Sequence, residues 1–278
     1  MHYELRVVGN PIAHSKSPVI HQEFARQTRL SVNYERVLAP LDDFAATIYA
    51  LQKAGVHGLN VTLPFKEQAF ALSHERSGRA ERAQAANTFL FKAQGRIFAD
   101  NTDGIGLVHD IQHNCAYSLR DKRVLICGAG GAVRGILFPL IQTLPGRLAI
   151  ANRTLEKALK LSGEFSNAMP IQALSYPDLA LQEFDVIIDG TAFADEALPL
   201  PSSLHLSQNS LCYDLKYQVG DSSFMRWAKA RHAGPVYDGL GMLVEQAAIA
   251  FELWTGRMPA TRPVIELLRS QFVEVRYE

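Results

Sequence analysis

A glycine-rich segment in the middle of the chain could bind the phosphates of a nucleotide. Residues 123–127 read Arg-Val-Leu-Ile-Cys, and residues 128–132 continue as Gly-Ala-Gly-Gly-Ala. Gly128 permits a tight turn, Gly130 lets the backbone approach a pyrophosphate, and a helix that begins near Gly131 directs free N–H groups at that anion. The sequence therefore predicts a dinucleotide site, with cofactor-binding residues Gly128, Ala129, Gly130, Gly131 and Ala132.

The end of the next apolar run indicates which dinucleotide is bound. Residues 147–151 follow the glycine turn at the spacing of a βαβ unit and end in Asn152-Arg153-Thr154. An NAD site usually places an acid about 20 residues after the turn to hold the ribose 2′-hydroxyl. Here a guanidinium stands between an amide and a hydroxyl, and these groups suit a 2′-phosphate. We therefore predict NADP. The alternative is a plain strand-to-helix turn, with Thr154 acting only as a helix N-cap.

Two serines near the N-terminus could bind an anion. Ser15 and Ser17 stand between an apolar run and a helical stretch in which Pro18 is suited to the first turn. Two hydroxyls beside a helix N-terminus form a site that suits a carboxylate. The alternative is that Ser17 only caps the helix.

A lysine and an aspartate follow two further predicted strands. Lys66 comes after Asn60-Val61-Thr62, and Asp103 comes after Asn101-Thr102. Reduction of a ketone needs a proton donor within hydrogen-bond reach of the carbonyl oxygen, and a lysine oriented by an acid can supply that proton. Each residue alone also has a plainer interpretation, because Lys66 could be an exposed residue at a helix start and Asp103 a helix N-cap.

Short apolar runs alternate with helical stretches in the first hundred residues, which indicates an α/β fold. The predicted strands there are Leu5–Val8, Tyr34–Leu38, Gly58–Thr62, Thr88–Phe91 and Arg96–Ala99. The predicted helices are one with Ser17 as its N-cap, Asp43–Lys53, Lys66–Ser73 and a linking helix over Gly104–Asn114.

The rest of the chain has the pattern of a parallel sheet followed by helices. Asp185–Ile188 and Leu211–Asp214 are apolar runs typical of strands buried on both faces. A long apolar helix is predicted over Met242–Trp254, and a final helix extends to about Phe272. We expect two α/β domains: an N-terminal substrate-binding domain, residues 1–103, to which the terminal helices in residues 240–278 return, and a C-terminal Rossmann-like dinucleotide-binding domain, residues 104–239.

Composition excludes several classes of function. The chain has 278 residues with 28 basic and 28 acidic side chains, so no net charge attracts nucleic acid or an anionic membrane. Cys115, Cys127 and Cys212 lack paired metal-ligand spacing, so we expect neither disulfides nor a metal site. No signal peptide or membrane-spanning run is recognisable, and we expect a cytoplasmic protein, either a monomer or a homodimer.

Eight segments in order resemble the shikimate dehydrogenase family, and the likeness extends over essentially the whole chain. They are residues 15–18, 60–66, 86–88, 101–104, 128–132, 152–154, 213–217 and 238–246. The resemblance implies an NADP-dependent oxidoreductase acting on a CH–OH group. Such an enzyme reversibly reduces 3-dehydroshikimate to shikimate with NADPH, in the biosynthesis of chorismate and the aromatic amino acids.

The resemblance also implies roles for individual residues. Lys66 and Asp103 would form the catalytic pair. The implied substrate-binding residues are Ser15 and Ser17 at the carboxylate, Asn60, Thr62, Asn87, Asp103 and Gln246 at the ring hydroxyls, and Tyr217. The implied cofactor-binding residues are the glycine turn, Asn152, Arg153, Thr154, Thr191 and Gly239. Tyr217 could instead be a core aromatic residue, and Gln246 an exposed residue of its helix.

Two positions depart from the family pattern. Residues 189–193 read Asp-Gly-Thr-Ala-Phe where the family usually has Asn-Ala-Thr-Ser. An ionised Asp189 close to the nicotinamide would favour NADP⁺ over NADPH, whereas an Asp189 that points away would only cap its loop. Val133 stands where a small residue normally allows close helix-to-strand packing, so we expect a slightly displaced helix.

Two other functions remain possible from the sequence. One is the quinate/shikimate branch of the family, which accepts quinate and often NAD; Arg153 argues against NAD. The other is a noncatalytic metabolite-binding or regulatory protein. Only the departure from the family pattern at Asp189 favours this alternative. The intact pair of Lys66 and Asp103 argues against this second alternative.

Overall fold

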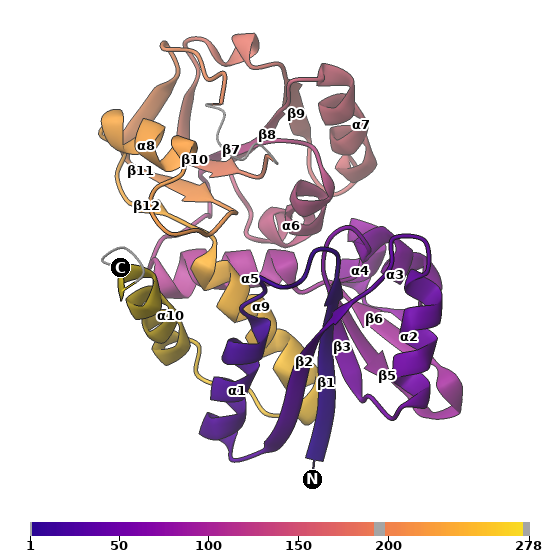
Figure 1. The fold of residues 1–278 in the computed structure, drawn as a ribbon. Coiled ribbons are helices and arrows are strands. Elements are labelled where there is room, and N and C mark those ends of the chain that lie inside the picture. Colours follow the sequence, from indigo (N-terminus) through magenta and orange to yellow (C-terminus); the bar gives the residue numbers. More distant parts are fainter. Residues whose placement is uncertain (1, 192–197, 275–278) are drawn as a thin grey trace. The chain divides into compact units, whose positions relative to one another are not determined.

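The computed structural model describes residues 2–191 and 198–274. Contacts divide the chain into two compact units: unit 1 comprises Met1–Gly106 and Leu243–Glu266, and unit 2 comprises Leu107–Met242 and Leu267–Glu278. Each unit is a sheet with helices on both faces (Figure 1), which confirms the predicted α/β class. The sequence-based boundaries at 103/104 and 239/240 stay a prediction of where the domains divide.

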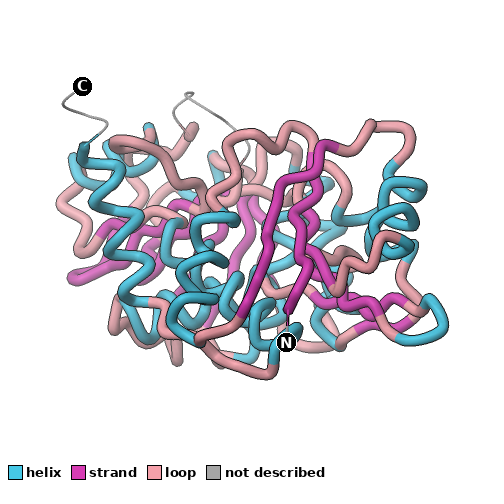
Figure 2. The backbone as a smooth tube through the Cα atoms, turned by 60° about the horizontal axis from the view of Figure 1, so that its bottom comes forward, coloured by secondary structure: helices cyan, strands magenta, loops and turns pink. Residues whose placement is uncertain are grey.

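Unit 1 is built on a six-stranded mixed sheet in the order β2-β1-β3-β5-β6-β4. Its strands are β1 (His2–Gly9), β2 (Ser31–Leu38), β3 (Gly58–Val61), β4 (Glu75–Arg76), β5 (Thr88–Phe91) and β6 (Ile97–Asp100). The long strands β1 and β2 run side by side in parallel (Figure 2). β5 is antiparallel to both β3 and β6, so the end of β3 lies beside the start of β5.

Helices cover both faces of this sheet because its strands bury alternate residues on each side. Leu5 and Val7 of β1 share a core cluster with Trp254, whereas Val8 belongs to a second cluster with Phe44. The helices are α1 (Ser17–Thr28), α2 (Phe44–Lys53), α3 (Lys66–Leu72), α4 (Gly78–Ala83), α5 (Asp103–His109) and α9 (Leu240–Thr255), with a 3₁₀ turn over Ala93–Gly95.

Unit 2 is built on a six-stranded sheet in the order β12-β11-β10-β7-β8-β9, in which every pair is parallel. Its strands are β7 (Arg123–Cys127), β8 (Arg147–Ala151), β9 (Ile171–Leu174), β10 (Glu183–Asp189), β11 (His205–Asp214) and β12 (Val236–Tyr237). The chain moves outward from β7 to β9 and then returns to add β10 on the other side of β7. This reversal beside β7 is the point at which Rossmann-like sheets bind dinucleotides.

Two apolar cores sandwich the sheet of unit 2. Val124 and Ile126 pack with α6 (Gly131–Gln142) and α7 (Leu155–Phe165) on one face, and Leu125 and Cys127 pack with α8 (Ser223–Ala230) on the other. The remaining elements are a π turn over Asp110–Asn114, a 3₁₀ turn over Pro177–Leu179 and α10 (Arg262–Glu274).

The structure corrects two local predictions. Lys16, not Ser17, occupies the N-cap position of α1, and no side chain caps that end. The predicted linking helix does not run regularly to Asn114, because α5 ends at His109 and continues as the π turn.

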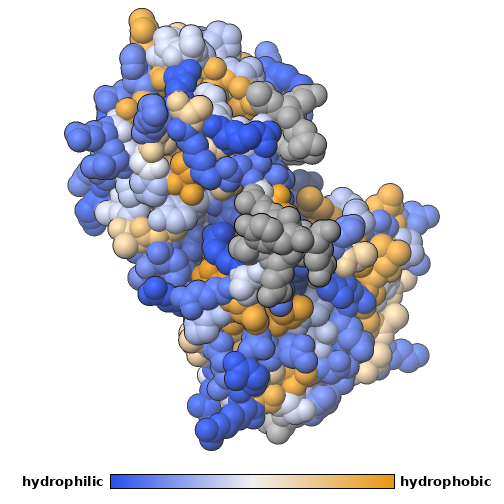
Figure 3. All heavy atoms as spheres, turned by 60° about the vertical axis from the view of Figure 1, so that its left-hand side comes forward, coloured by the Kyte–Doolittle hydropathy of each residue, from blue (hydrophilic) through white to orange (hydrophobic). Residues whose placement is uncertain are grey.

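Among the described residues, no helix is both long and apolar enough to cross a membrane. On the face shown in Figure 3, polar side chains separate scattered apolar ones. No group of three or more potential metal-ligating side chains occurs in the part of the chain that the structure describes.

Candidate functional site

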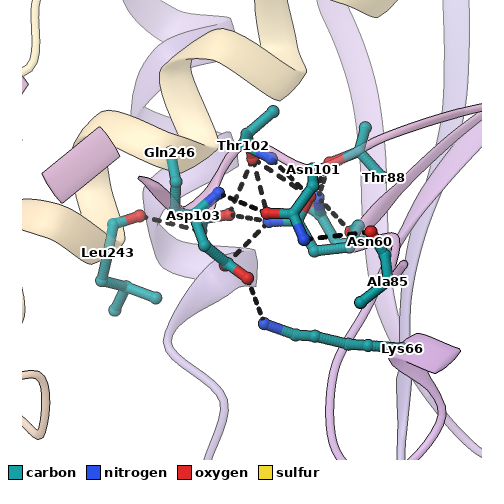
Figure 4. Close-up of polar contacts among 10 residues, drawn as sticks. Asn60, Lys66, Ala85, Thr88, Asn101, Thr102, Asp103, Leu243 and Gln246 are labelled. Atoms are coloured by element: carbon teal, nitrogen blue, oxygen red, sulfur yellow. Dashed lines mark hydrogen bonds and ion pairs between the residues drawn. The ribbon is translucent and has the colours of Figure 1, made fainter. Parts of the chain in front are cut away.

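The structure brings Lys66 and Asp103 together (Figure 4). Lys66 is the first residue of α3, just beyond β3, and Asp103 is the first residue of α5, just beyond β6. Lys66 Nζ donates to Asp103 Oδ2 at 2.6 Å, and the two side chains are 24% and 12% exposed. Asn101 Oδ1 accepts a bond from the backbone N–H of Asp103 at 3.2 Å. The carboxylate of Asp103 is thus available to hold the ammonium group in place.

Asn87 is the centre of the polar network around this pair. Its Nδ2 lies 2.9 Å from Thr102 Oγ1, 2.9 Å from Asp103 Oδ1 and 3.0 Å from Gln246 Oε1. Three acceptors therefore compete for two amide hydrogens. Asn87 is only 3% exposed, so it orients the Asp103 carboxylate from the protein interior.

Gln246 of α9 is turned into the network and is not an exposed helix residue. Its Oε1 accepts from Asn87, and its Nε2 donates to the carbonyl of Leu243 at 2.9 Å. α5 can approach this part of α9 because Gly106 has no side chain: a Cβ there would stand 2.7 Å from the backbone N of Gln246. A residue distant in sequence is thereby fixed beside Asp103.

Asn60, at the end of β3, is buried and fully oriented. Its Oδ1 accepts from the Tyr34 hydroxyl at 2.7 Å. Its Nδ2 donates to the carbonyl of Asn87 at 3.2 Å and to Thr88 Oγ1 at 3.1 Å. Sequence reasoning singled out neither Tyr34 nor Thr88 as a site residue, because no local motif connects β2 and β5 to β3.

The two serines lie together at the start of α1. Ser15 Oγ donates to Ser17 Oγ at 3.2 Å and accepts from the Ser17 N–H at 3.3 Å. The Arg36 guanidinium of β2 donates to the carbonyl of Ser15, which brings a positive charge to this turn. Thr62 follows β3, and its N–H donates to the carbonyl of Val8 at 2.9 Å. Hydroxyls, a helix N-terminus and a cation suit a carboxylate.

The glycine turn of unit 2 has the geometry of an anion site. Gly128 has φ of +106° and donates its N–H to the carbonyl of Ala151 at 2.7 Å. Gly130 is the N-cap of α6, and a Cβ on Gly130 or Gly131 would meet no atom within 4 Å. The first N–H groups of this twelve-residue helix have no acceptor within the helix, and the turn that precedes them includes Ala129, with Ala132 in the first turn of the helix. A pyrophosphate fits this arrangement.

Asn152, Arg153 and Thr154 form the turn from β8 into α7. Asn152 Nδ2 donates to the carbonyl of Thr154 at 2.9 Å, which shapes the turn. Thr154 is the N-cap of α7, but its side chain makes no capping bond. Arg153 is exposed on the turn. These groups suit a ribose 2′-phosphate.

Asp189 does not present a free negative charge. It is 1% exposed, its Oδ1 accepts from the N–H and hydroxyl of Thr191, and its Oδ2 lies 3.0 Å from Lys216 Nζ. Of the two alternatives for Asp189, these contacts favour the one in which its side chain caps its own loop, with the carboxylate paired to Lys216. Ala192 and Phe193 of the same departure lie outside the described residues.

The departure at Val133 is accommodated at Gly190. A Cβ on Gly190 would stand 2.6 Å from Val133 Cγ2, so the larger side chain on α6 occupies space that an alanine at 190 would need. Gly190 also packs against the turn, since its carbonyl oxygen lies 3.0 Å from the Cβ position of Gly128. The two departures from the family pattern thus fit each other.

Two further predicted residues lie near the strand ends of unit 2. The N–H of Gly239 donates to the carbonyl of Lys216 at 2.9 Å, and a Cβ there would stand 2.2 Å from the carbonyl oxygen of Leu215. Only glycine fits this approach. Tyr217 is half-buried, and burial raises the pKa of its hydroxyl. Its contact with substrate stays a prediction.

Family models match three parts of the chain. Residues 7–89 match the shikimate dehydrogenase substrate binding domain, residues 110–201 match shikimate / quinate 5-dehydrogenase, and residues 239–269 match the shikimate 5′-dehydrogenase C-terminal domain. The matched parts include both the polar network of unit 1 and the glycine turn of unit 2.

Individual relatives match along nearly the full length. The NADP(+) shikimate dehydrogenase of Laribacter hongkongensis is 49% identical over 267 residues, covering 95% of this chain and 97% of the relative. An Ael1 enzyme from Pseudomonas putida has a similar structure, with a TM-score of 0.90, 42% identity and coverage of 96% and 98%. Shikimate 5-dehydrogenase from Thermus thermophilus, in complex with NADP(H) and shikimate, gives a TM-score of 0.86, 32% identity and coverage of 96% and 99%. These matches show that the chain belongs to the shikimate dehydrogenase family.

Proposed function

We propose that this chain is an NADP-dependent shikimate dehydrogenase that reversibly reduces 3-dehydroshikimate to shikimate. The observation that carries the proposal is the pair of Lys66 and Asp103, joined at 2.6 Å and held by Asn87. A ketone reduction needs a positioned proton donor, and this pair supplies one in a chain whose relatives are named for the reaction.

Lys66 donates the proton in the reductive direction. NADPH supplies a hydride to the carbonyl carbon when it is bound. The ammonium group of Lys66 polarises the carbonyl oxygen and delivers a proton to it, and in the reverse direction the neutral amine takes that proton back. Asp103 holds Nζ in position throughout, and Asn87 holds Asp103.

Substrate binding is divided between the carboxylate and the ring hydroxyls. Ser15 and Ser17 bind the carboxylate at the start of α1. The remaining acceptor site on Asn60 Oδ1 and the amide of Gln246, with Thr62 and Asn87, bind hydroxyls. The hydroxyl of Tyr217, which is half-buried, makes a further contact with the substrate.

The cofactor-binding residues lie at the strand ends of unit 2. The N–H groups at the start of α6 bind the pyrophosphate, and Asn152, Arg153 and Thr154 bind the ribose 2′-phosphate. Thr191 shapes its loop by donating a hydrogen bond from its hydroxyl to Asp189. Gly239 shapes the neighbouring loop because its backbone lies close to the carbonyl of Leu215.

A spectrophotometric assay tests the proposal directly. The purified chain is mixed with shikimate or quinate and with NADP⁺ or NAD⁺, and formation of the reduced cofactor is followed. The expected result is rapid reduction of NADP⁺ with shikimate and slow reactions in the other three mixtures. Equal rates with quinate and NAD⁺ would assign the chain to the quinate-using branch, and absence of any reaction would indicate a noncatalytic protein.

A further inference from the structure

A buried tyrosine lies behind the substrate-binding side chains of unit 1. Tyr34 of β2 is 9% exposed, and its hydroxyl donates to Asn60 Oδ1 at 2.7 Å. Tyr34 occurs in none of the motifs that predict the site. Its hydroxyl also interacts with the Ser17 side chain, so Tyr34 contacts two residues that bind substrate in the proposed function.

The hydrogen-bonding capacity of Asn60 explains why this contact matters. A side-chain amide has two hydrogens and an oxygen with two acceptor positions. Both hydrogens of Asn60 are engaged, by the carbonyl of Asn87 and by Thr88 Oγ1, and Tyr34 fills one acceptor position. One acceptor position on Oδ1 is therefore left, and it can receive a hydrogen bond from a substrate hydroxyl.

The ring of Tyr34 is itself held by a stack of aromatic side chains. The imidazole of His21 lies parallel to it, with ring centroids 4.2 Å apart and an interplanar angle of 13°. Phe251 stacks on His21 at 6.0 Å, and Trp254 lies at 5.4 Å. His21 is on α1 one turn after Ser17, so the same helix face carries a predicted carboxylate ligand and the support for Tyr34.

The chemistry of His21 is consistent with a purely supporting role. Among the described residues neither of its ring nitrogens makes a hydrogen bond of normal geometry, and burial lowers its pKa to about 3, although the nearby Asn60 side chain acts in the opposite direction. It therefore stays neutral at physiological pH and contributes a flat ring to the stack. Burial also raises the pKa of Tyr34, so the phenol keeps the proton that it donates to Asn60.

We infer that Tyr34 is a positioning residue for substrate recognition: its hydroxyl orients the Asn60 amide so that Oδ1 accepts a hydrogen bond from a ring hydroxyl of the substrate. This inference rests on the proposed function. It assigns to Tyr34 an effect on shikimate affinity that is transmitted through Asn60.

A double-mutant cycle tests this transmission. Tyr34→Phe keeps the ring and removes the hydroxyl. Because one neutral hydrogen bond is lost, it should raise the Kd for shikimate about three- to tenfold. It should leave the Kd for NADP⁺ unchanged, and kcat should fall less than the KM for shikimate rises. In an Asn60→Ala background, the same substitution should change the Kd for shikimate little. An unchanged Kd in Tyr34→Phe, or an equal effect in both backgrounds, would overturn the inference.

Two further variants separate positioning from general destabilisation. Tyr117→Phe removes a tyrosine hydroxyl that donates to the carbonyl of Asp185 in unit 2 at 3.1 Å, and it should leave shikimate affinity unchanged. His21→Phe keeps an aromatic ring in the stack and should also preserve the affinity. If Tyr117→Phe weakens shikimate binding as much as Tyr34→Phe does, the effect is not specific. If His21→Phe abolishes binding, the imidazole and not Tyr34 is the acting group.

Shikimate titration of the wild-type chain distinguishes failure of the proposed function from failure of the role inferred for Tyr34. If the wild type neither binds nor oxidises shikimate, the proposed function fails, and the role of Tyr34 fails with it. If the wild type does both and only the mutant cycle is additive, the role of Tyr34 alone is refuted.

Discussion

The two regions assigned to substrate and cofactor are built in opposite ways. In unit 1, side chains from β2, β3, β5, α5 and α9 join in one buried network of hydrogen bonds around Asn87. In unit 2, the cofactor turn presents backbone N–H groups at the start of α6, and no atom lies within 4 Å of the Cβ positions of Gly130 and Gly131. The first region depends on the identity of its side chains, and the second depends on the absence of side chains.

This difference determines which substitutions each region tolerates. A buried polar network loses function when one partner is removed, because the remaining groups stay desolvated and unpaired. A glycine turn loses function when a side chain is added that obstructs the anion or cannot adopt the backbone conformation, such as the positive φ of Gly128. The following variants test this contrast.

The largest effect is expected from Lys66→Met. Turnover should fall about 10²- to 10⁴-fold, the usual contribution of a positioned acid–base group, while the Kd for shikimate changes much less. Steady-state kinetics and shikimate titration measure the two quantities. Lys92→Met is the matched control, since Lys92 pairs with Glu75 on the surface of the same unit. Wild-type turnover in Lys66→Met would refute a catalytic role.

Replacement of both Ser15 and Ser17 by alanine should weaken shikimate binding and leave NADPH binding nearly unchanged. Each lost bond to a charged group contributes roughly 1.5 to 3 kcal/mol. Calorimetric titration measures both affinities. As a control, Ser166→Ala with Ser270→Ala removes two exposed hydroxyls that bond only to carbonyls of nearby residues. Unchanged shikimate affinity with a lower melting temperature would mean that the two serines are structural.

In unit 2, Arg153→Ala should erode the preference for NADPH over NADH by about tenfold or more, because one charge-assisted contact with the 2′-phosphate is lost. Kd values for both cofactors give the preference. Arg226→Ala, which removes an exposed guanidinium from α8, should leave it unchanged. Equal losses of affinity for NADPH and NADH would show that Arg153 is structural.

The smallest effect is expected in the stability of unit 2. Gly190→Ala adds a Cβ that would stand 2.6 Å from Val133 Cγ2, so it should lower the free energy of unfolding by about 1 to 3 kcal/mol. Val133→Ala in the same chain should recover part of that loss. Urea unfolding of the wild type, both single variants and the double variant measures the coupling. Strictly additive losses would show that the two positions do not share space.

Local patterns predicted the fold and much of the site. The apolar runs and the glycine turn of unit 2 correctly predicted β7, β8 and the start of α6. Such elements can be predicted because the burial of a strand and the geometry of a turn depend mainly on residues adjacent in the sequence. The functional motifs likewise led to Lys66 and Asp103. Individual strand bounds agreed less well: β1 begins at His2 rather than Leu5, since an edge pairing with β2 extends it.

Contacts between distant segments could not be predicted in the same way. Tyr34 contacts Asn60 because the sheet places β2 and β3 on the two sides of β1. Lys216 contacts Asp189 because β10 and β11 are neighbours in the other sheet. The second contact decides between the two alternatives for Asp189, because the residues next to it in the sequence include no cation that could pair with its carboxylate. Its partner Lys216, 27 residues later, pairs with that charge.

The fit of Val133 against Gly190 also makes the effect of a substitution at one position depend on the residue at the other. Alanine at 190 beside Val133 would place a Cβ 2.6 Å from Val133 Cγ2, so a chain that carries both should be less stable than one with glycine at 190. Alanine at 190 should be tolerated better once Val133 is replaced by a smaller residue. Of the two orders in which the pair can be exchanged, the one that never combines valine at 133 with alanine at 190 therefore avoids the less stable intermediate.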